Sequence, residues 1–298
     1  MAAVIRTAKS GDRKSLQIIW NTVFGDPHEE IDAFFSIFPE PGMAVVADTG
    51  TGPVAAGYIL PTGNLLYHGS IITCAMIYSV ATLPEYRNRG YGAAVVRELI
   101  SLGYARGYKA LVLCPSSDSM YEYYSKRSDM RSWFYTSEMS FSSAPASDKA
   151  ALIRVAEEEY SNLREHLLAG TPHIAFDKRM LSYQLALAGR SGGGLFRADA
   201  PGGVGCAVVE MQTDGGVWIK ELLASGADEH CVLSAIALKY PAAEYTVRTP
   251  ALSPAPATRR FGMLAISDDT MISDNSEFRI SDSEFFGSAL PYYGLAFD

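Results

Sequence analysis

Apolar and polar residues alternate along the first part of the chain in two ways, one typical of helices and one of strands. Between Gly11 and Phe24 the apolar positions follow helical spacing, and Pro27 opens a second segment of this kind that ends at Phe38. Both segments are therefore predicted to be amphipathic helices. Apolar runs bounded by turn residues instead indicate strands. We expect strands at 4–8, 43–47, 54–60, 70–81, 110–114 and 133–141.

The longest apolar run, at 70–81, is almost uninterrupted, which is typical of a central strand buried on both faces. A loop rich in arginine and glycine follows Leu83-Pro84 and leads into an amphipathic helix that ends at Gly107. After the strand that ends at Cys114, Ser116-Ser117-Asp118 is expected to cap a helix that contains three tyrosines.

The second half of the chain follows a polar linker predicted at 142–149. Helices are expected at 148–168, 177–188 and 229–239, and strands at 195–198, 204–211, 217–223 and 244–248. Asp214-Gly215-Gly216 predicts a hairpin turn between two of these strands. The order long strand, loop, helix, strand and proline thus occurs in both halves. We interpret it as a degenerate internal duplication, with chance similarity between two α/β halves as the alternative.

Charge and cysteine content narrow the functional classes. The 33 acidic and 25 basic residues give a formal net charge of −8, which argues against nucleic acid as a partner. Four cysteines in 298 residues are too few for a disulfide scaffold, and their spacing does not suggest a zinc site. No apolar run approaches membrane-spanning length, and the N-terminus lacks the apolar core of a signal peptide. We therefore expect a cytoplasmic protein that binds neither a metal nor a membrane.

The loop between the central strand and the next helix contains the features of an anion site. Backbone N–H groups at a helix start, together with the positive end of the helix dipole, bind anions. Gly90 and Gly92 let phosphate oxygens approach the backbone, while Arg87 and Arg89 supply positive charge. The spacing matches neither a Walker-type phosphate loop nor the dinucleotide fingerprint. A solvated turn is the alternative interpretation.

In its context, Arg87-x-x-Gly90-x-Gly92 resembles the acyl-CoA pyrophosphate motif of the GNAT N-acetyltransferases, because it follows VATLPEY and precedes an amphipathic helix. The resemblance covers most of 1–142, and with its second half the whole chain is similar to the tandem-GNAT group. It implies an α/β (α+β) fold with a mixed, mostly antiparallel central sheet flanked by helices. It also implies a catalytic acetyl-CoA-binding domain at 1–142 and a degenerate second GNAT-like domain at 148–298.

The resemblance also assigns roles to individual residues. The backbone of the strand end would pair with the pantetheine arm of acetyl-CoA, and a bulge would separate this strand from its neighbour. The amides of the loop would hold the pyrophosphate, with the two arginines at its edge. The residues assigned in this way are Val80, Ala81, Thr82, Arg87, Asn88, Arg89, Gly90, Tyr91, Gly92 and Ala93.

The helix after Pro115 provides the second point of resemblance. MYEYYSKRSDM is similar to the family segment in which a tyrosine precedes a Lys/Arg-Gly-Phe ending, and Tyr124 takes the tyrosine position. The role this implies is to protonate the departing CoA thiolate. Ser128-Asp129 replaces the usual Gly-Phe, so Tyr121 and Tyr123 stay as alternatives. Each tyrosine could instead only pack its ring on the helix face.

The general base is not assigned, since the central strand contains no carboxylate. Glu29, Glu30, His68 and the C-terminal carboxylate of Asp298 are the candidates. The second-half loop at 224–230 has one glycine, no arginine and two acidic residues, so we expect it to repel a diphosphate.

The expected activity is direct transfer of an acetyl group from acetyl-CoA to a primary amine of a small molecule. The acidic balance of the chain favours a cationic acceptor. Trp218 and Tyr292-Tyr293 are candidates to line the acceptor pocket, and a homo-oligomer is compatible with the sequence. The alternatives are a non-catalytic acyl-CoA-binding or regulatory module and a binder of nucleoside diphosphates.

Overall fold

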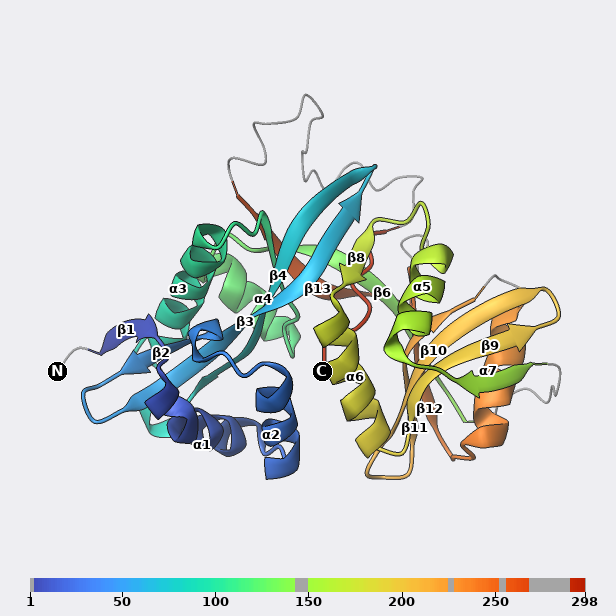
Figure 1. Cartoon of the computed structure of the whole chain (residues 1–298), viewed down its shortest axis with the longest axis horizontal. Coiled ribbons are helices and arrows are strands. Elements are labelled where there is room, and N and C mark those ends of the chain that lie inside the picture. Colours follow the sequence, from blue (N-terminus) through green and yellow to red (C-terminus); the bar gives the residue numbers. More distant parts are fainter. Residues whose placement is uncertain (1–2, 143–149, 225–227, 252–255, 268–289, 298) are drawn as a thin grey trace. The chain divides into compact units, whose positions relative to one another are not determined.

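The computed structural model describes residues 3–142, 150–224, 228–251, 256–267 and 290–297 (Figure 1). These residues divide into two compact units. Unit 1 comprises 3–65, 71–133 and 262–267, and unit 2 comprises 66–70, the described part of 134–261, and 290–297. Both units combine helices with mixed, mostly antiparallel strands, which confirms the expected fold class.

Unit 1 contains the elements predicted before residue 133 and most of one strand from near the end of the chain. Its strands lie in the order β1-β2-β3-β4-β5-β13, of which β4 and β5 are parallel. The elements are β1 (Val4–Thr7), α1 (Arg13–Phe24), α2 (His28–Ile37), β2 (Ala44–Asp48), β3 (Pro53–Tyr67), β4 (Ser70–Thr82), α3 (Tyr91–Ala105), β5 (Ala110–Leu113), α4 (Asp118–Arg127) and β13 (Thr258–Ile266).

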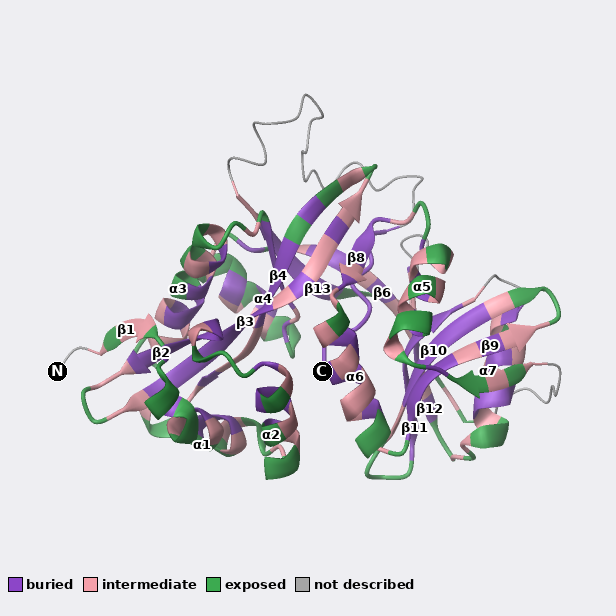
Figure 2. Ribbon diagram, in the orientation of Figure 1, coloured by how far each residue is buried: buried purple, intermediate pink, exposed green. Residues whose placement is uncertain are grey.

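Different helices cover the two faces of the unit 1 sheet. Because side chains alternate along a strand, neighbouring residues of β3 contact different helices. On β3, Gly57 and Ile59 face α3, and a Cβ at Gly57 would lie 2.9 Å from Leu99. Tyr58, between them, faces the aromatic residues of α1 and α2, with its ring centroid 5.0 Å from that of Phe34. Figure 2 shows that the buried residues follow β2 and β3.

Unit 2 has strands in the order β6-β12-β11-β10-β9-β7, of which β11 and β12 are parallel. The segment 290–297 is also part of this unit and is buried throughout. The elements are β6 (Arg131–Phe141), β7 (Ala151–Arg154), α5 (Glu157–Leu167), β8 (His173–Phe176), α6 (Lys178–Arg190), β9 (Gly194–Ala200), β10 (Gly203–Met211), β11 (Val217–Leu223), α7 (Glu229–Lys239) and β12 (Tyr245–Thr249).

A buried ion pair fastens the C-terminal segment within unit 2. The Arg164 guanidinium donates to the Glu221 carboxylate at 3.0 Å, and both side chains are almost fully buried. The same guanidinium donates to the backbone carbonyl of Tyr293 at 3.3 Å. A Cβ at Gly294 would collide with the Glu221 carboxylate, so only glycine fits this position.

The helix predicted at 148–168 is wrong in its first part. Residues 151–154 form β7, which pairs antiparallel with β9 from Ala151↔Asp199 to Arg154↔Phe196, and the helix α5 begins only at Glu157. The strand pairing overrides the helix propensity of alanine, leucine and arginine in this segment. Strands β8 and β13 are not among the predicted elements, although the apolar run at 261–266 contains the pattern of a buried strand.

The same order of elements occurs in each half of the sequence. In unit 1 a hairpin, β3 and β4, leads through a loop into α3 and then into β5, which is parallel to β4. In unit 2, β10 and β11 lead into α7 and then into β12, which is parallel to β11. The predicted boundaries, 1–142 and 148–298, differ from the compact units, because 262–267 lie in unit 1 and 134–142 in unit 2. The linker predicted at 142–149 lies almost entirely outside the described residues.

Candidate active site

The central strand β4 loses its regular geometry shortly before it ends. It pairs with β5 from Cys74↔Ala110 to Met76↔Val112 and then continues to Thr82 beyond the last of these pairs. Within this extension Ser79 has a φ of 48°, in the left-handed region that residues other than glycine rarely adopt. Such a conformation costs about 1–3 kcal/mol, and strain of this kind is concentrated at functional sites.

The loop after β4 has the backbone of an anion-binding nest. Asn88 and Gly90 both adopt left-handed conformations, with φ values of 61° and 81°. The first turn of α3 follows, and Ala94 N–H donates to the Gly90 carbonyl at 3.0 Å. Because a helix supplies no acceptor for its first N–H groups, those of Tyr91, Gly92 and Ala93 are available to a ligand. Alternating conformations of this kind form concavities that bind phosphate groups.

Both arginines of the motif are exposed and lie along the loop. The Arg87 Nε donates to the Thr82 carbonyl at 3.2 Å, and the Arg89 Nη2 donates to the Glu85 carbonyl at 3.0 Å. The Arg89 guanidinium also lies 5.3 Å from the centre of the Tyr86 ring. Each guanidinium has five N–H donors, so these backbone bonds hold the side chains beside the loop and leave further donors for an anion.

The three tyrosines of α4 differ in their surroundings. Tyr124 is 8% exposed and belongs to the buried cluster with α3, and Tyr121 is also buried. Tyr123 is only partly buried, and a Cβ at Gly92 would lie 3.3 Å from its hydroxyl oxygen and 3.4 Å from the Thr82 Oγ1. The structure thus brings together the end of β4, the start of α3 and Tyr123. Burial, with a smaller effect of Tyr123, raises the pKa of the Tyr124 hydroxyl, so it keeps its proton at neutral pH.

The described candidate bases lie on different elements. Glu29 and Glu30 lie in the first turn of α2, where the helix dipole stabilises acidic residues. His68 is exposed in the turn between β3 and β4, at the opposite end of β4 from the loop. Asp298 lies outside the described residues. In the described parts of the chain, no helix is long and apolar enough to cross a membrane, and no group of His, Cys, Asp and Glu is arranged to hold a metal.

The corresponding helix start in unit 2 contains its own carboxylate. Asp228 precedes α7 and is 4% exposed, and its Oδ1 accepts from the Gly202 N–H at 3.0 Å. A Cβ at Gly202 would lie 2.7 Å from the Asp228 Oδ2, so the carboxylate is closely covered. A buried negative charge at this place opposes the binding of a phosphate group.

Residues 4–127 match the family model described as an acetyltransferase (GNAT) domain. This match confirms, for this part of the chain, the resemblance predicted from the loop motif. The family uses acetyl-CoA as the acetyl donor. Comparison with curated proteins finds no significant match to the sequence.

Solved structures share the fold over most of the chain. A GCN5-related N-acetyltransferase from Kribbella flavida aligns over 89% of this chain and 72% of its own, with a TM-score of 0.65 and 17% identity. Eis1 from Mycobacterium abscessus aligns over 89% and 74%, with a TM-score of 0.63 and 12% identity. A putative acetyltransferase from Pyrococcus horikoshii aligns over 90% of both chains, with a TM-score of 0.58 and 17% identity. At these identities the likeness establishes the fold alone.

Proposed function

We propose that this chain is an N-acetyltransferase that moves an acetyl group from acetyl-CoA to a primary amine of a small molecule. The main support is the loop between β4 and α3, where left-handed residues, helix N–H groups and two arginines lie together. These groups suit the pyrophosphate of CoA. The part of β4 beyond its pairs with β5, from Val80 through Thr82, then offers its backbone to the pantetheine arm.

The acceptor nitrogen attacks the thioester carbonyl directly, and the carbon–sulfur bond breaks as the amide forms. Tyr124 donates its hydroxyl proton to the departing sulfur, while the proton of the amine passes to a base or to water. Tyr124 fits this role because its buried hydroxyl, whose pKa is raised, stays protonated. Tyr123 is the alternative donor, since its hydroxyl lies beside the end of β4 and the start of α3.

Binding of acetyl-CoA is the first test, measured as thermal unfolding with and without the ligand. At about a hundredfold excess over Kd, the ligand should stabilise the fold by about 2.7 kcal/mol. The Arg87→Ala, Gly90→Glu double variant should lose this shift, because it removes a cation and adds a negative charge within the nest. Arg97→Ala is the matched control, since Arg97 is exposed on α3 outside the loop. No shift in the folded parent would exclude the proposal.

Turnover is tested separately, by the release of free CoA thiol in the presence of a panel of small amines. Amine-dependent release supports the transferase.

A non-catalytic acyl-CoA-binding module is the second candidate function, and the sequence at the end of α4, which departs from the family pattern, favours it. There the Ser128 Oγ donates to the Tyr124 carbonyl at 2.8 Å, where the family pattern has glycine. Acetyl-CoA that binds but survives with every amine would favour this second function.

A further inference from the structure

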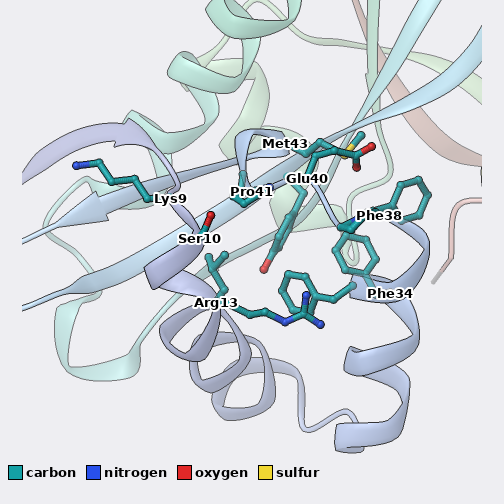
Figure 3. A pocket seen from close by; sticks show the side chains of 13 residues that line it. Lys9, Ser10, Arg13, Phe34, Phe38, Glu40, Pro41 and Met43 are labelled. Carbon is teal, nitrogen blue, oxygen red and sulfur yellow. The ribbon is translucent and has the colours of Figure 1, made fainter.

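Unit 1 contains a cavity of about 230 Å³ on the face of the sheet that α1 and α2 cover (Figure 3). Most of its wall is apolar and aromatic, and it is formed by α1, α2, β2 and β3. The wall includes the apolar and aromatic residues Leu16, Phe34, Phe35, Phe38, Met43 and Tyr58, and the charged residues Lys9, Arg13 and Glu40 also line the cavity. Its volume is suited to a ligand of a few carbon atoms or a single ring.

One buried polar group in this wall has no hydrogen-bond partner among the described residues. Tyr58 is 3% exposed, and its hydroxyl is enclosed without a donor or acceptor beside it. Buried hydroxyl groups are nearly always hydrogen-bonded, and an unsatisfied one costs about 1–3 kcal/mol. Burial raises the pKa of this hydroxyl, so it is protonated and can donate. The wall therefore contains one hydrogen-bond donor without a partner.

Arg13 supplies a positive charge to the same cavity. Its guanidinium lies 4.6 Å from the centre of the Phe35 ring, and its charge acts on the Tyr58 hydroxyl. Figure 3 shows the Arg13 side chain extending from α1 towards α2, whereas Lys9 points away from the cavity. Arg13 is exposed in the first turn of α1, and its contact with the Phe35 ring holds its charge at the cavity wall.

We propose that this cavity binds a small apolar carboxylate. The carboxylate accepts hydrogen bonds from the Tyr58 hydroxyl and the Arg13 guanidinium, and the apolar part packs against the rings of α2. A guanidinium and a neutral hydroxyl together suit a carboxylate. Glu40 also lines the cavity, and an aromatic wall can hold an ammonium ion, but the Arg13 guanidinium already covers the Phe35 ring and its charge opposes a second cation there.

The cavity adjoins the irregular part of β4 through a continuous set of rings. The Phe34 ring lies 5.0 Å from the Tyr58 ring and 5.8 Å from that of Tyr78, which directly precedes Ser79. Carboxylate binding is nevertheless a separate property from acetyl transfer. It can be measured without acetyl-CoA, so it can fail or succeed independently of the proposed activity.

The test is isothermal titration calorimetry of the full chain with 3-phenylpropanoate, 3-phenylpropylamine and 3-phenylpropan-1-ol. These three probes share one skeleton and differ in charge. We expect the carboxylate to bind at least tenfold more tightly than the amine or the alcohol. Tyr58→Phe and Arg13→Met should each weaken its binding about tenfold or more, because each removes a hydrogen bond to a charged group. Lys14→Met is the control, an exposed neighbour on α1 outside the cavity wall.

Thermal unfolding of the same variants separates a ligand role from a structural one. Since the Tyr58 hydroxyl has no partner in the free protein, Tyr58→Phe should leave the unfolding temperature unchanged or raise it. Tighter binding of the amine, binding of no probe at millimolar concentration, or unchanged carboxylate affinity in a folded Tyr58→Phe variant would each overturn the proposal.

Discussion

Tyr123 and Tyr124 are neighbours in sequence, yet their hydroxyls have different environments. Tyr124 is buried against α3, whereas Tyr123 is partly exposed beside Gly92 and its ring lies 4.5 Å from the Arg127 guanidinium. If Tyr124 protonates the departing thiolate, Tyr124→Phe should lower kcat about a hundredfold or more. The affinity for acetyl-CoA should change little, because the loop is untouched. Steady-state kinetics with the best amine of the panel, together with calorimetry, would measure both effects.

Tyr123→Phe is the matched variant, and it should retain most of the parent's kcat. A larger loss in Tyr123→Phe than in Tyr124→Phe would assign the proton donor to Tyr123. Equal retention of activity in both variants would show that the leaving group takes its proton from elsewhere.

Arg6 illustrates how a single residue ties together three segments of unit 1. Its guanidinium donates to Asp12, before α1, and to Asp48, at the end of β2, both at 2.7 Å. These hydrogen bonds lower the pKa of both carboxyl groups in the folded state. Their contribution to stability is therefore present above the ordinary pKa of aspartate and is lost as the pH falls through the lowered values.

Arg6→Met should lower the free energy of unfolding by about 1–3 kcal/mol at neutral pH, since the pairs are only partly buried. The difference between parent and variant should shrink at about pH 3, below the ordinary pKa of aspartate, because the carboxyl groups of the unfolded chain are then protonated. Urea unfolding of both proteins at the two pH values measures this. A difference that stays constant with pH would show that Arg6 acts by packing alone.

At the scale of elements, the close approach of α3 to the sheet depends on a glycine. A Cβ at Gly103 would lie 2.6 Å from the Leu111 Cδ2 and 2.8 Å from the Ile59 Cδ1, both fully buried. Gly103→Ala should therefore destabilise unit 1 by about 1–3 kcal/mol despite the better helix propensity of alanine. Chemical denaturation would measure the loss.

Gly189→Ala provides the control, because Gly189 also lies in a helix but has no heavy atom within 4 Å of the place that a Cβ would take. There the substitution should be neutral or stabilising by up to about 1 kcal/mol. Equal destabilisation of both variants would mean that the contact of the new Cβ with Leu111 and Ile59 does not cause the loss of stability in Gly103→Ala.

Elements with a strong local pattern are predictable from the sequence. The run at 70–81 is β4, and the helices predicted after Gly11, Pro27 and Gly92 are α1, α2 and α3. The helix prediction at β7 is wrong because four residues of an edge strand have no periodicity of their own, and pairing with β9 decides their conformation. The left-handed φ of Ser79 and the unsatisfied hydroxyl of Tyr58 depend on tertiary packing. Neither feature can be predicted from the presence of a serine or a tyrosine in the sequence.

For the whole molecule, the two helix starts that follow β4 and β11 lead to different expectations for ligand stoichiometry. The first has left-handed residues, available N–H groups and two exposed arginines. The second has the buried carboxylate of Asp228, which accepts from the Gly202 N–H. The Asp228 carboxylate therefore lies at the start of α7, where a phosphate group would need a positive potential.

We therefore expect one molecule of acetyl-CoA to bind per chain, although the order of elements is duplicated. Isothermal titration calorimetry should give a single site, and the Arg87→Ala, Gly90→Glu variant should show no residual binding at the same concentrations. Asp228→Asn keeps the shape of the side chain while removing its charge, and it should leave the stoichiometry at one because unit 2 still has no arginine in its loop. Two sites in the parent, or binding that survives in the loop variant, would show that the second unit also holds the ligand.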